Sequence, residues 1–135
     1  MAERHWFTRL LAIVLLFVVS VPVSHAAPVL TPPDPQPLAT YSISGTLNAN
    51  WIVWYGPYYE TRGSKMTIRI TWNPSTSGVR FGLCTSTTQS SCSWTGTYTG
   101  GSGSHTFTVP SSGNYYLAIW NTGPEAISYN GSIDV

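Results

Sequence analysis

Alternation of apolar and polar residues is the sequence feature that most limits the fold of this chain. It is clearest in residues 65–72, where Met66, Ile68, Ile70 and Trp72 are separated by polar or charged residues. Because successive side chains of a strand point to opposite faces, this pattern predicts a strand with one buried face. Sliding the strand by one residue would bury charged side chains instead, so its register is well specified.

Similar short runs recur along the chain, and no segment has a sustained helical period. The further expected strands cover residues 41–47, 51–55, 79–84, 94–99, 105–109, 115–121 and 127–135, with Trp94 and Tyr98 expected on one side of theirs. About eight strands at this spacing are typical of a β-sandwich or a closed barrel. We predict an all-β fold, a two-sheet antiparallel β-sandwich of jelly-roll type.

The stretch 110–121 predicts a specific pairing of two strands. Pro110 ends the run 105–109, residues 111–114 are turn formers, and Tyr115 begins a run rich in aromatic and β-branched residues. We interpret the two runs as an antiparallel hairpin with a longer loop.

The first 26 residues have the pattern of a secretory signal peptide. An apolar run at 10–23 is followed by Ser24-His-Ala26, which places small residues at the −3 and −1 positions, so we expect cleavage after Ala26. A retained anchor is the alternative, but the run is shorter than the ~20 apolar residues that a spanning helix needs. Residues 27–40 contain five prolines and are expected to be an extended linker. Residues 41–135 are then the β-sandwich domain of a protein that is secreted or held at the cell surface.

The charge of the expected mature chain narrows its partners. Residues 27–135 contain four acidic and four basic side chains and no basic run, which argues against nucleic-acid binding. They contain no charged amphipathic segment, which argues against a membrane-surface role after signal cleavage. His105 is the one imidazole in these residues, which excludes a four-ligand zinc site. We expect no cofactor and no metal.

Cys84 and Cys92 are the two cysteines of the chain. In an exported protein two cysteines are expected to form a disulfide, and a redox or metal pair is the alternative. Closing so short a loop stabilises the fold by about 2.5 kcal/mol in the chain-entropy model.

Five segments, taken in order, carry a family resemblance. They are the aromatic pair in 53–55, the Gly-x-x-(apolar-polar)-Trp pattern of 63–73, the alternating run 79–83, the Gly-x-Tyr-x-(apolar) pattern of 112–121, and the closing Tyr-x-(apolar)-x-Val pattern within 129–135. Together they resemble the bacterial pre-peptidase C-terminal domain family over about residues 41–135. The resemblance implies a secreted β-sandwich of the kind appended to extracellular proteases and other hydrolases.

The chain departs from that family in its acidic residues. Family members often carry Asp between the third and fourth strands, where this chain has Asn73-Pro-Ser-Thr-Ser-Gly78. Some collagen-binding relatives hold calcium near the N-terminal edge, where this chain offers only Asp34. Calcium takes six or more oxygen ligands, several of them carboxylates. We therefore expect no calcium site.

The sequence contains no constellation that predicts catalysis. The four mature carboxylates are scattered and form no acid–base pair. His105 lies near Ser102 and Ser104, but no third group is placed to orient it. We predict that the protein is not an enzyme.

The aromatic residues are the remaining candidates for a site, although most of them are expected to fill the core. In the run 115–121, Tyr116 and Trp120 face opposite to Tyr115, Leu117 and Ile119, and only one set can meet the core. Aromatic side chains outside the core are suited to sugar stacking and to protein interfaces. The predicted ligand-binding residues are Tyr58, Tyr59, Tyr116 and Trp120.

Two functions fit these observations. The first is a secreted, non-catalytic module that binds an extracellular polymer or a protein partner, in adhesion or as an accessory to an enzyme. The second is a structural subunit that self-assembles into an extracellular filament or matrix by strand exchange. In that case residues 41–47 are the better donor, because the prolines in 27–38 remove the N–H groups that a ladder needs.

Overall fold

The computed structural model describes residues 38–135, so the predicted signal peptide and most of the predicted linker lie outside the described residues. The described chain forms eight strands and one short 3₁₀ turn. They are β1 (Thr40–Leu47), β2 (Ile52–Glu60), β3 (Lys65–Asn73), β4 (Val79–Cys84), η2 (Gln89–Ser91), β5 (Cys92–Trp94), β6 (Ser102–Thr108), β7 (Gly113–Asn121) and β8 (Ile127–Asp134). No helix in residues 38–135 is long and apolar enough to cross a membrane.

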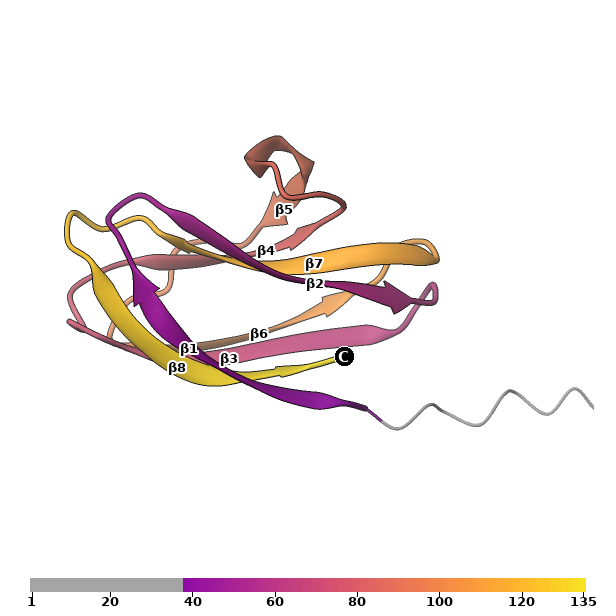
Figure 1. Cartoon of the computed structure of the whole chain (residues 1–135), viewed down its shortest axis with the longest axis horizontal. Coiled ribbons are helices and arrows are strands. Elements are labelled where there is room, and N and C mark those ends of the chain that lie inside the picture. The colour runs from indigo at the N-terminus through magenta and orange to yellow at the C-terminus, as the bar shows by residue number, and fades with distance from the viewer. Residues whose placement is uncertain (1–37) are drawn as a thin grey trace, which may run out of the picture. The chain divides into compact units, whose positions relative to one another are not determined.

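Two four-stranded antiparallel sheets pack face to face. The first sheet has the order β1-β8-β3-β6 and the second has the order β2-β7-β4-β5. Figure 1 shows β2, β7 and β4 lying in a layer over β1, β8, β3 and β6. Consecutive strands repeatedly alternate between the two sheets, which is jelly-roll connectivity. The predicted fold class is confirmed.

The core lies between the two inner faces and follows from the alternation. In β3, Met66, Ile68 and Ile70 are at most 2% exposed, as the pattern of 65–72 predicts. From the second sheet, Phe81 and Leu117 are fully buried against them. Burying a side chain of this size stabilises a fold by about 1.5–3 kcal/mol.

The predicted hairpin between 105–109 and 115–121 is wrong. Both runs form strands, but β6 pairs with β3 in the first sheet and β7 pairs with β2 and β4 in the second. The segment from Val109 to Ser112 therefore crosses from one sheet to the other. Alternation and turn residues here predict that the two runs are strands, but they do not choose the partner of either strand.

The expected strand at 94–99 is also wrong. The strand β5 ends at Trp94, and Tyr98 makes only an isolated bridge to Val79. Tyr98 packs against the core, with its ring 5.1 Å from that of Phe81. Trp94 pairs with Gly82 on the outer side of the second sheet. The two aromatic residues thus lie on opposite sides of the sheet, because the chain leaves the ladder between them.

The first strand, β1, belongs to its own domain. It pairs with β8 along its whole length, from Thr40 opposite Asp134 to Leu47 opposite Ile127. Beyond the strand, the backbone N–H of Ala39 donates to the carbonyl of Val135, and that of Val135 donates back to Ala39. The sheet edge that a donated strand would fill is occupied here by the chain itself.

Candidate functional site

The central strand of the second sheet, β7, separates core and surface side chains. Tyr115, Leu117 and Ile119 are at most 4% exposed and face the first sheet. Tyr116 and Trp120 point to the other side and are partly exposed. Of the two sets in this run, the second therefore lies outside the core.

Neighbouring strands add further rings to this outer surface. Trp54 of β2 pairs with Ala118, and Trp94 of β5 pairs with Gly82, which itself pairs with Ala118. We call the surface formed by Trp54, Trp94, Tyr116, Trp120 and Arg80 the aromatic face. The rings of Trp94 and Trp120 have centroids 5.3 Å apart and planes tilted by 59°.

Small residues make room for these rings. A Cβ atom on Gly82 would lie 2.8 Å from the ring of Trp94, closer than carbon atoms normally approach. Ala118, between Gly82 and Trp54, is fully covered although it faces outward. The large side chains thus pack over Gly82 and Ala118.

Hydrogen bonds hold two of the indoles in place. Trp120 Nε1–H donates to Asn50 Oδ1 at 3.1 Å, and Trp94 Nε1–H donates to the carbonyl of Gln89 at 3.2 Å. Asn50 has a positive φ of 64°, a conformation that asparagine tolerates better than most residues. Its backbone N–H donates to the carbonyl of Asn121 at 2.8 Å. The turn between β1 and β2 therefore fixes the orientation of Trp120.

Arg80 supplies the charge of the aromatic face. It lies opposite Trp120 in the β4–β7 ladder, and its guanidinium carbon is 5.3 Å from the centroid of the Trp120 ring. Its Nε–H donates to the carbonyl of Thr95 at 2.7 Å. Stacking of a guanidinium on an indole is a favourable cation–π contact.

The predicted disulfide is confirmed. Cys84 and Cys92 are bonded and lie opposite each other in β4 and β5. The bond closes the loop 85–91, which contains η2 and Gln89, the acceptor of the Trp94 indole. It therefore ties the short strand that carries Trp94 to the body of the second sheet.

The structure separates the other two predicted ligand residues. Tyr59 is 67% exposed and pairs with Asn114, on the same side of the sheet as Tyr116. Tyr58 faces the other way, packs against the core and stacks on Tyr41 with centroids 5.5 Å apart. Burial, and to a lesser degree the neighbouring phenol of Tyr41, raises the pKa of Tyr58.

That tyrosine pair joins the edges of the two sheets, because Tyr41 lies on β1 and Tyr58 on β2. Deeper between the sheets, the hydroxyls of Tyr55 and Tyr129 are hydrogen-bonded, and burial together with this bond raises the pKa of Tyr55.

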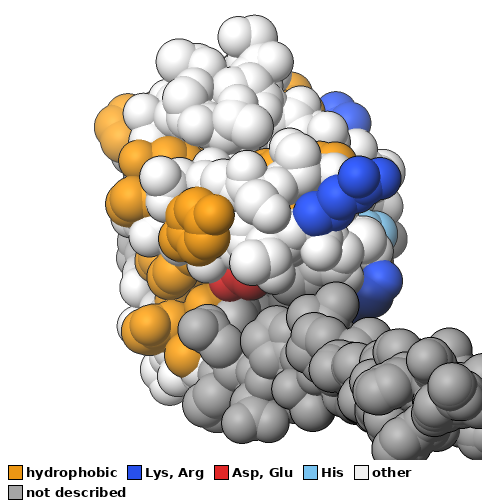
Figure 2. Space-filling model, turned by 90° about the vertical axis from the view of Figure 1, so that its right-hand side faces the viewer, with side chains coloured by type: hydrophobic (Ala, Val, Ile, Leu, Met, Phe, Trp, Pro, Cys, Tyr) orange, Lys and Arg blue, Asp and Glu red, His pale blue; other side chains and the backbone are white. Residues whose placement is uncertain are grey.

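Figure 2 shows one end of the domain, with hydrophobic side chains gathered on one side and Lys and Arg side chains on the other.

Sequence reasoning did not select Trp54, Trp94 or Arg80 as site residues. The sequence shows that these residues are aromatic or basic, and the alternation of residues 79–84 puts Arg80 on the side of the strand opposite to its apolar residues. What the sequence lacks is the pairing of β7 with β2 and β4, which brings all three beside Tyr116 and Trp120. Recognising them requires knowledge of the sheet order.

The outer surface of the first sheet has a different character, and we call it the polar face. Its outward residues on β3 and β8 are Lys65, Thr67, Arg69, Thr71, Asn73, Ser128, Asn130, Ser132 and Asp134. A shallow hollow of about 410 Å³ lies on it, lined by Arg69, Thr71, Ser102, Ser104, Asn130 and Ser132, with the backbone of neighbouring residues.

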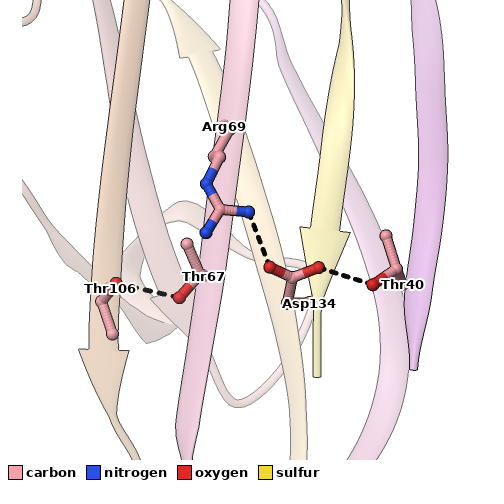
Figure 3. Close-up of polar contacts among 5 residues, drawn as sticks. All are labelled: Thr40, Thr67, Arg69, Thr106 and Asp134. Atoms are coloured by element: carbon pink, nitrogen blue, oxygen red, sulfur yellow. Dashed lines mark hydrogen bonds and ion pairs between the residues drawn. The ribbon is translucent and has the colours of Figure 1, made fainter. Parts of the chain in front are cut away.

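Two of the charged side chains on the polar face, Arg69 and Asp134, are paired. Arg69 Nη1 donates to Asp134 Oδ2 at 2.7 Å, and Thr40 Oγ1 donates to Asp134 Oδ1 at 2.8 Å. Figure 3 shows this row, with Thr67 and Thr106 hydrogen-bonded beside it. The bonds from Thr40 and Arg69 lower the pKa of the Asp134 carboxyl.

The described residues hold no group of three or more His, Cys, Asp or Glu side chains that could bind a metal ion. His105 Nδ1 is 3.0 Å from the hydroxyl of Tyr98, and its ring packs edge-on against Phe107. The imidazole thus contacts Tyr98 and Phe107 rather than a serine hydroxyl. The arrangement that stands out on the surface is the aromatic face.

Comparisons with known proteins find similarity only among solved structures. No protein-family model matches the chain, and neither does the sequence of any curated protein. The structure is similar to that of Aeromonas hydrophila PliG, a periplasmic lysozyme inhibitor of g-type lysozyme, with a TM-score of 0.49, 16% identity, and coverage of 84% of this chain and 92% of that one. It is also similar to the C-terminal CBM6 of LamC from Zobellia galactanivorans, with a TM-score of 0.44, 12% identity, and coverage of 73% and 100%. Identities this low leave function to be argued from the chain's own residues.

Proposed function

We propose that this protein is a secreted, non-catalytic binding module that holds an extracellular polymer or protein partner against its aromatic face. One observation carries the proposal: Trp94, Tyr116 and Trp120 lie together on the outside of a sheet, partly exposed and outside the core. If this surface only had to be solvated, polar side chains would serve as well here as they do on the polar face of the first sheet. Large rings outside the core suit contact with a partner.

Hydrogen bonds within the chain hold two of the rings in place. The neighbouring indoles of Trp94 and Trp120 each donate their N–H to an acceptor within the chain, and the disulfide secures the strand of Trp94. A surface that is already ordered loses little conformational entropy when it binds. This rigidity favours recognition of a repeating, stiff ligand such as a polysaccharide, whose sugar rings can stack on the indoles.

The location of the protein is part of the proposal. Cys84 and Cys92 form a disulfide, and disulfides persist mainly in oxidising compartments outside the cytosol. The predicted signal peptide and the low charge of residues 27–135 agree with an extracellular role. A module of the pre-peptidase C-terminal kind, as the sequence resemblance implies, would have the same location and would serve adhesion or an accompanying enzyme.

Assembly by strand exchange is the less favoured function. It requires β1 to leave its own sheet, where it is paired with β8 from Thr40 to Leu47. An exchanged strand is expected to be held weakly at home or to leave an open edge. The full ladder between β1 and β8 favours the binding module.

The test replaces Trp120 and compares it with two other tryptophans. Trp120→Ala should weaken retention of the purified protein on its ligand by about 1–3 kcal/mol, a range taken from base–aromatic stacking, while lowering the melting temperature little. The ligand is found first by pull-down on insoluble cellulose, chitin and peptidoglycan and on immobilised extracellular-matrix protein.

Two variants serve as references. Trp51 is 62% exposed but precedes β2 outside the aromatic face, so Trp51→Ala should change neither binding nor stability by much. Trp72 is 5% exposed and donates its indole N–H to Ser77, so Trp72→Ala should cost about 3–5 kcal/mol of stability. If Trp120→Ala unfolds the protein as readily as Trp72→Ala, or leaves binding intact, the proposal fails.

A further inference from the structure

Arg80 differs from the other described cations in how it is held. Its Nε–H is bonded to the carbonyl of Thr95, and its guanidinium lies over Trp120. No described carboxylate pairs with it, and its Nη groups have no described hydrogen-bond partner. The side chain is thus oriented by the protein while the outer edge of the guanidinium, with its N–H donors, is left for a ligand.

The surroundings of Arg80 contain no compensating charge. Its cross-strand neighbours on the outer side of the second sheet are aromatic or small. The three described acidic residues lie elsewhere: Glu60 accepts a hydrogen bond from Ser64 at the end of β2, Glu125 is in the turn before β8, and Asp134 is on the first sheet. The aromatic face is therefore a hydrophobic surface with one fixed positive charge.

The polar face provides an internal comparison. Arg69 also projects outward from its sheet, but Asp134 accepts its hydrogen bond at 2.7 Å. A positive charge that serves only solubility does not need an orienting bond or a ring beneath it. The two arginines thus both face outward, on opposite sheets, and have different surroundings.

Arg80 and the rings together match one class of ligand. A guanidinium with free N–H groups recognises a carboxylate by paired, charge-assisted hydrogen bonds. The indoles of Trp94 and Trp120 offer stacking surfaces, and the guanidinium carbon is 5.3 Å from the Trp120 ring centroid. One sugar unit is long enough to meet both groups. A polyphosphate such as a nucleic acid would require several cations instead.

Building on the proposed function, we infer that the ligand is a polysaccharide whose sugar units carry carboxylate groups, as in a uronic-acid polymer. The carboxylate pairs with the Nη groups of Arg80, and the sugar rings pack on the aromatic face. Charge complementarity selects the acidic polymer, and stacking selects a sugar over a free anion. Because the ion pair is partly exposed, added salt weakens this selectivity more than it weakens stacking.

The experiment compares polymers that differ only in charge. Polygalacturonate, alginate and hyaluronan are each immobilised as the free acid and as the methyl ester, and binding of the purified protein is measured by titration. The unmodified protein should bind at least one free acid tenfold or more above its ester, as expected for a charge-assisted hydrogen bond. Arg80→Gln should reduce that ratio to near one, and 0.5 M salt should lower it.

Matched variants assign the effect to the site. Arg69→Gln removes the paired arginine of the polar face and should leave the preference for the acid unchanged. Trp120→Ala should weaken binding of acid and ester alike. Arg80→Lys keeps the charge but loses the planar fork, so it should retain only part of the preference. Melting curves for every variant identify any loss that is due to unfolding.

Several outcomes overturn the inference. Equal binding of acid and ester overturns it and leaves the proposed function in place, as does binding to neutral polymers alone. A preference that Arg69→Gln abolishes and Arg80→Gln spares also overturns it. If the protein binds poly-glutamate through Arg80 but binds no polysaccharide, the inference is wrong and the partner is an acidic protein. If the unmodified protein binds none of the tested polymers and proteins, the proposed function is overturned as well.

Discussion

On the first sheet the outward side chains bond to one another across the strands. On the second sheet aromatic rings gather around Arg80, which has no described carboxylate partner. The row of Thr40, Asp134 and Arg69 joins three strands of the polar face. The row of Trp94, Trp120 and Arg80 joins three strands of the aromatic face. The two sheets have equal numbers of strands and equivalent positions in the sandwich, so the architecture does not require the difference.

The aromatic face is less completely satisfied than the polar face. Trp54 Nε1–H is buried and has no hydrogen-bond partner in the described part of the chain. An unpaired buried donor costs about 1–3 kcal/mol. Residues chosen for stability alone would avoid that cost, as the polar face does. Under the proposed function, contact with a partner accounts for this difference, because rings outside the core suit a covered surface and polar side chains suit contact with water.

The largest expected loss of stability comes from a substitution that would clash with the backbone rather than with a side chain. A Cβ on Gly131 of β8 would lie 1.9 Å from the carbonyl oxygen of Arg69, which is backbone and cannot move aside. Gly131→Ala should therefore destabilise the first sheet by about 3 kcal/mol or more, at or beyond the upper end of overpacking effects. Thermal unfolding measures it, and a melting temperature near that of the unmodified protein would contradict the close approach.

The matched change on the second sheet should act on binding instead. The Cβ in Gly82→Ala would meet the ring of Trp94, a partly exposed side chain that can swing away. We expect a loss of stability below about 1 kcal/mol and a clear loss of ligand retention, because Trp94 leaves Trp120. If Gly82→Ala is as destabilising as Gly131→Ala, the aromatic face is part of the stability of the sandwich.

Removing the disulfide tests how the aromatic face is ordered. Changing both Cys84 and Cys92 to Ser should lower the free energy of unfolding by about 2.5 kcal/mol in the chain-entropy model. It should also weaken ligand binding, since β5 carries Trp94. Denaturant unfolding and ligand titration measure the two effects. Unchanged binding in the folded variant would show that Trp94 is positioned without the bond.

The smallest effect is expected on the polar face and depends on pH. The pKa of Asp134 is lowered in the folded state, so its contribution to stability is present above its ordinary value of 3.8 and is lost as the pH falls through the folded pKa. At neutral pH, Asp134→Asn should cost less than about 1 kcal/mol, as for other exposed ion pairs. The difference from the unmodified protein should vanish in acid. A difference that persists at pH 2 would point to a role for Asp134 other than its charge.

Local chemistry accounts for the successes of prediction. The strand expected at 65–72 is β3, Lys65–Asn73, because its alternation depends on nothing beyond neighbouring residues. The disulfide followed from two cysteines a short loop apart in a chain predicted to be exported. The division of β7 into Tyr115, Leu117 and Ile119 against Tyr116 and Trp120 followed from the period of a strand. Which of the two sets would be exposed did not follow.

What the sequence determined by itself, then, is most of the strands and the two sides of those strands, with the expected strand at 94–99 as the exception. Tertiary structure alone decided the partners: β7 lies between β2 and β4 rather than beside β6, so Arg80 and Trp94 join Trp120. The physical reason is range. Alternation and turn propensity act over a few residues, whereas sheet order depends on how all eight strands bury their apolar sides at once. The aromatic face, assembled from β2, β4, β5 and β7, is a product of that packing.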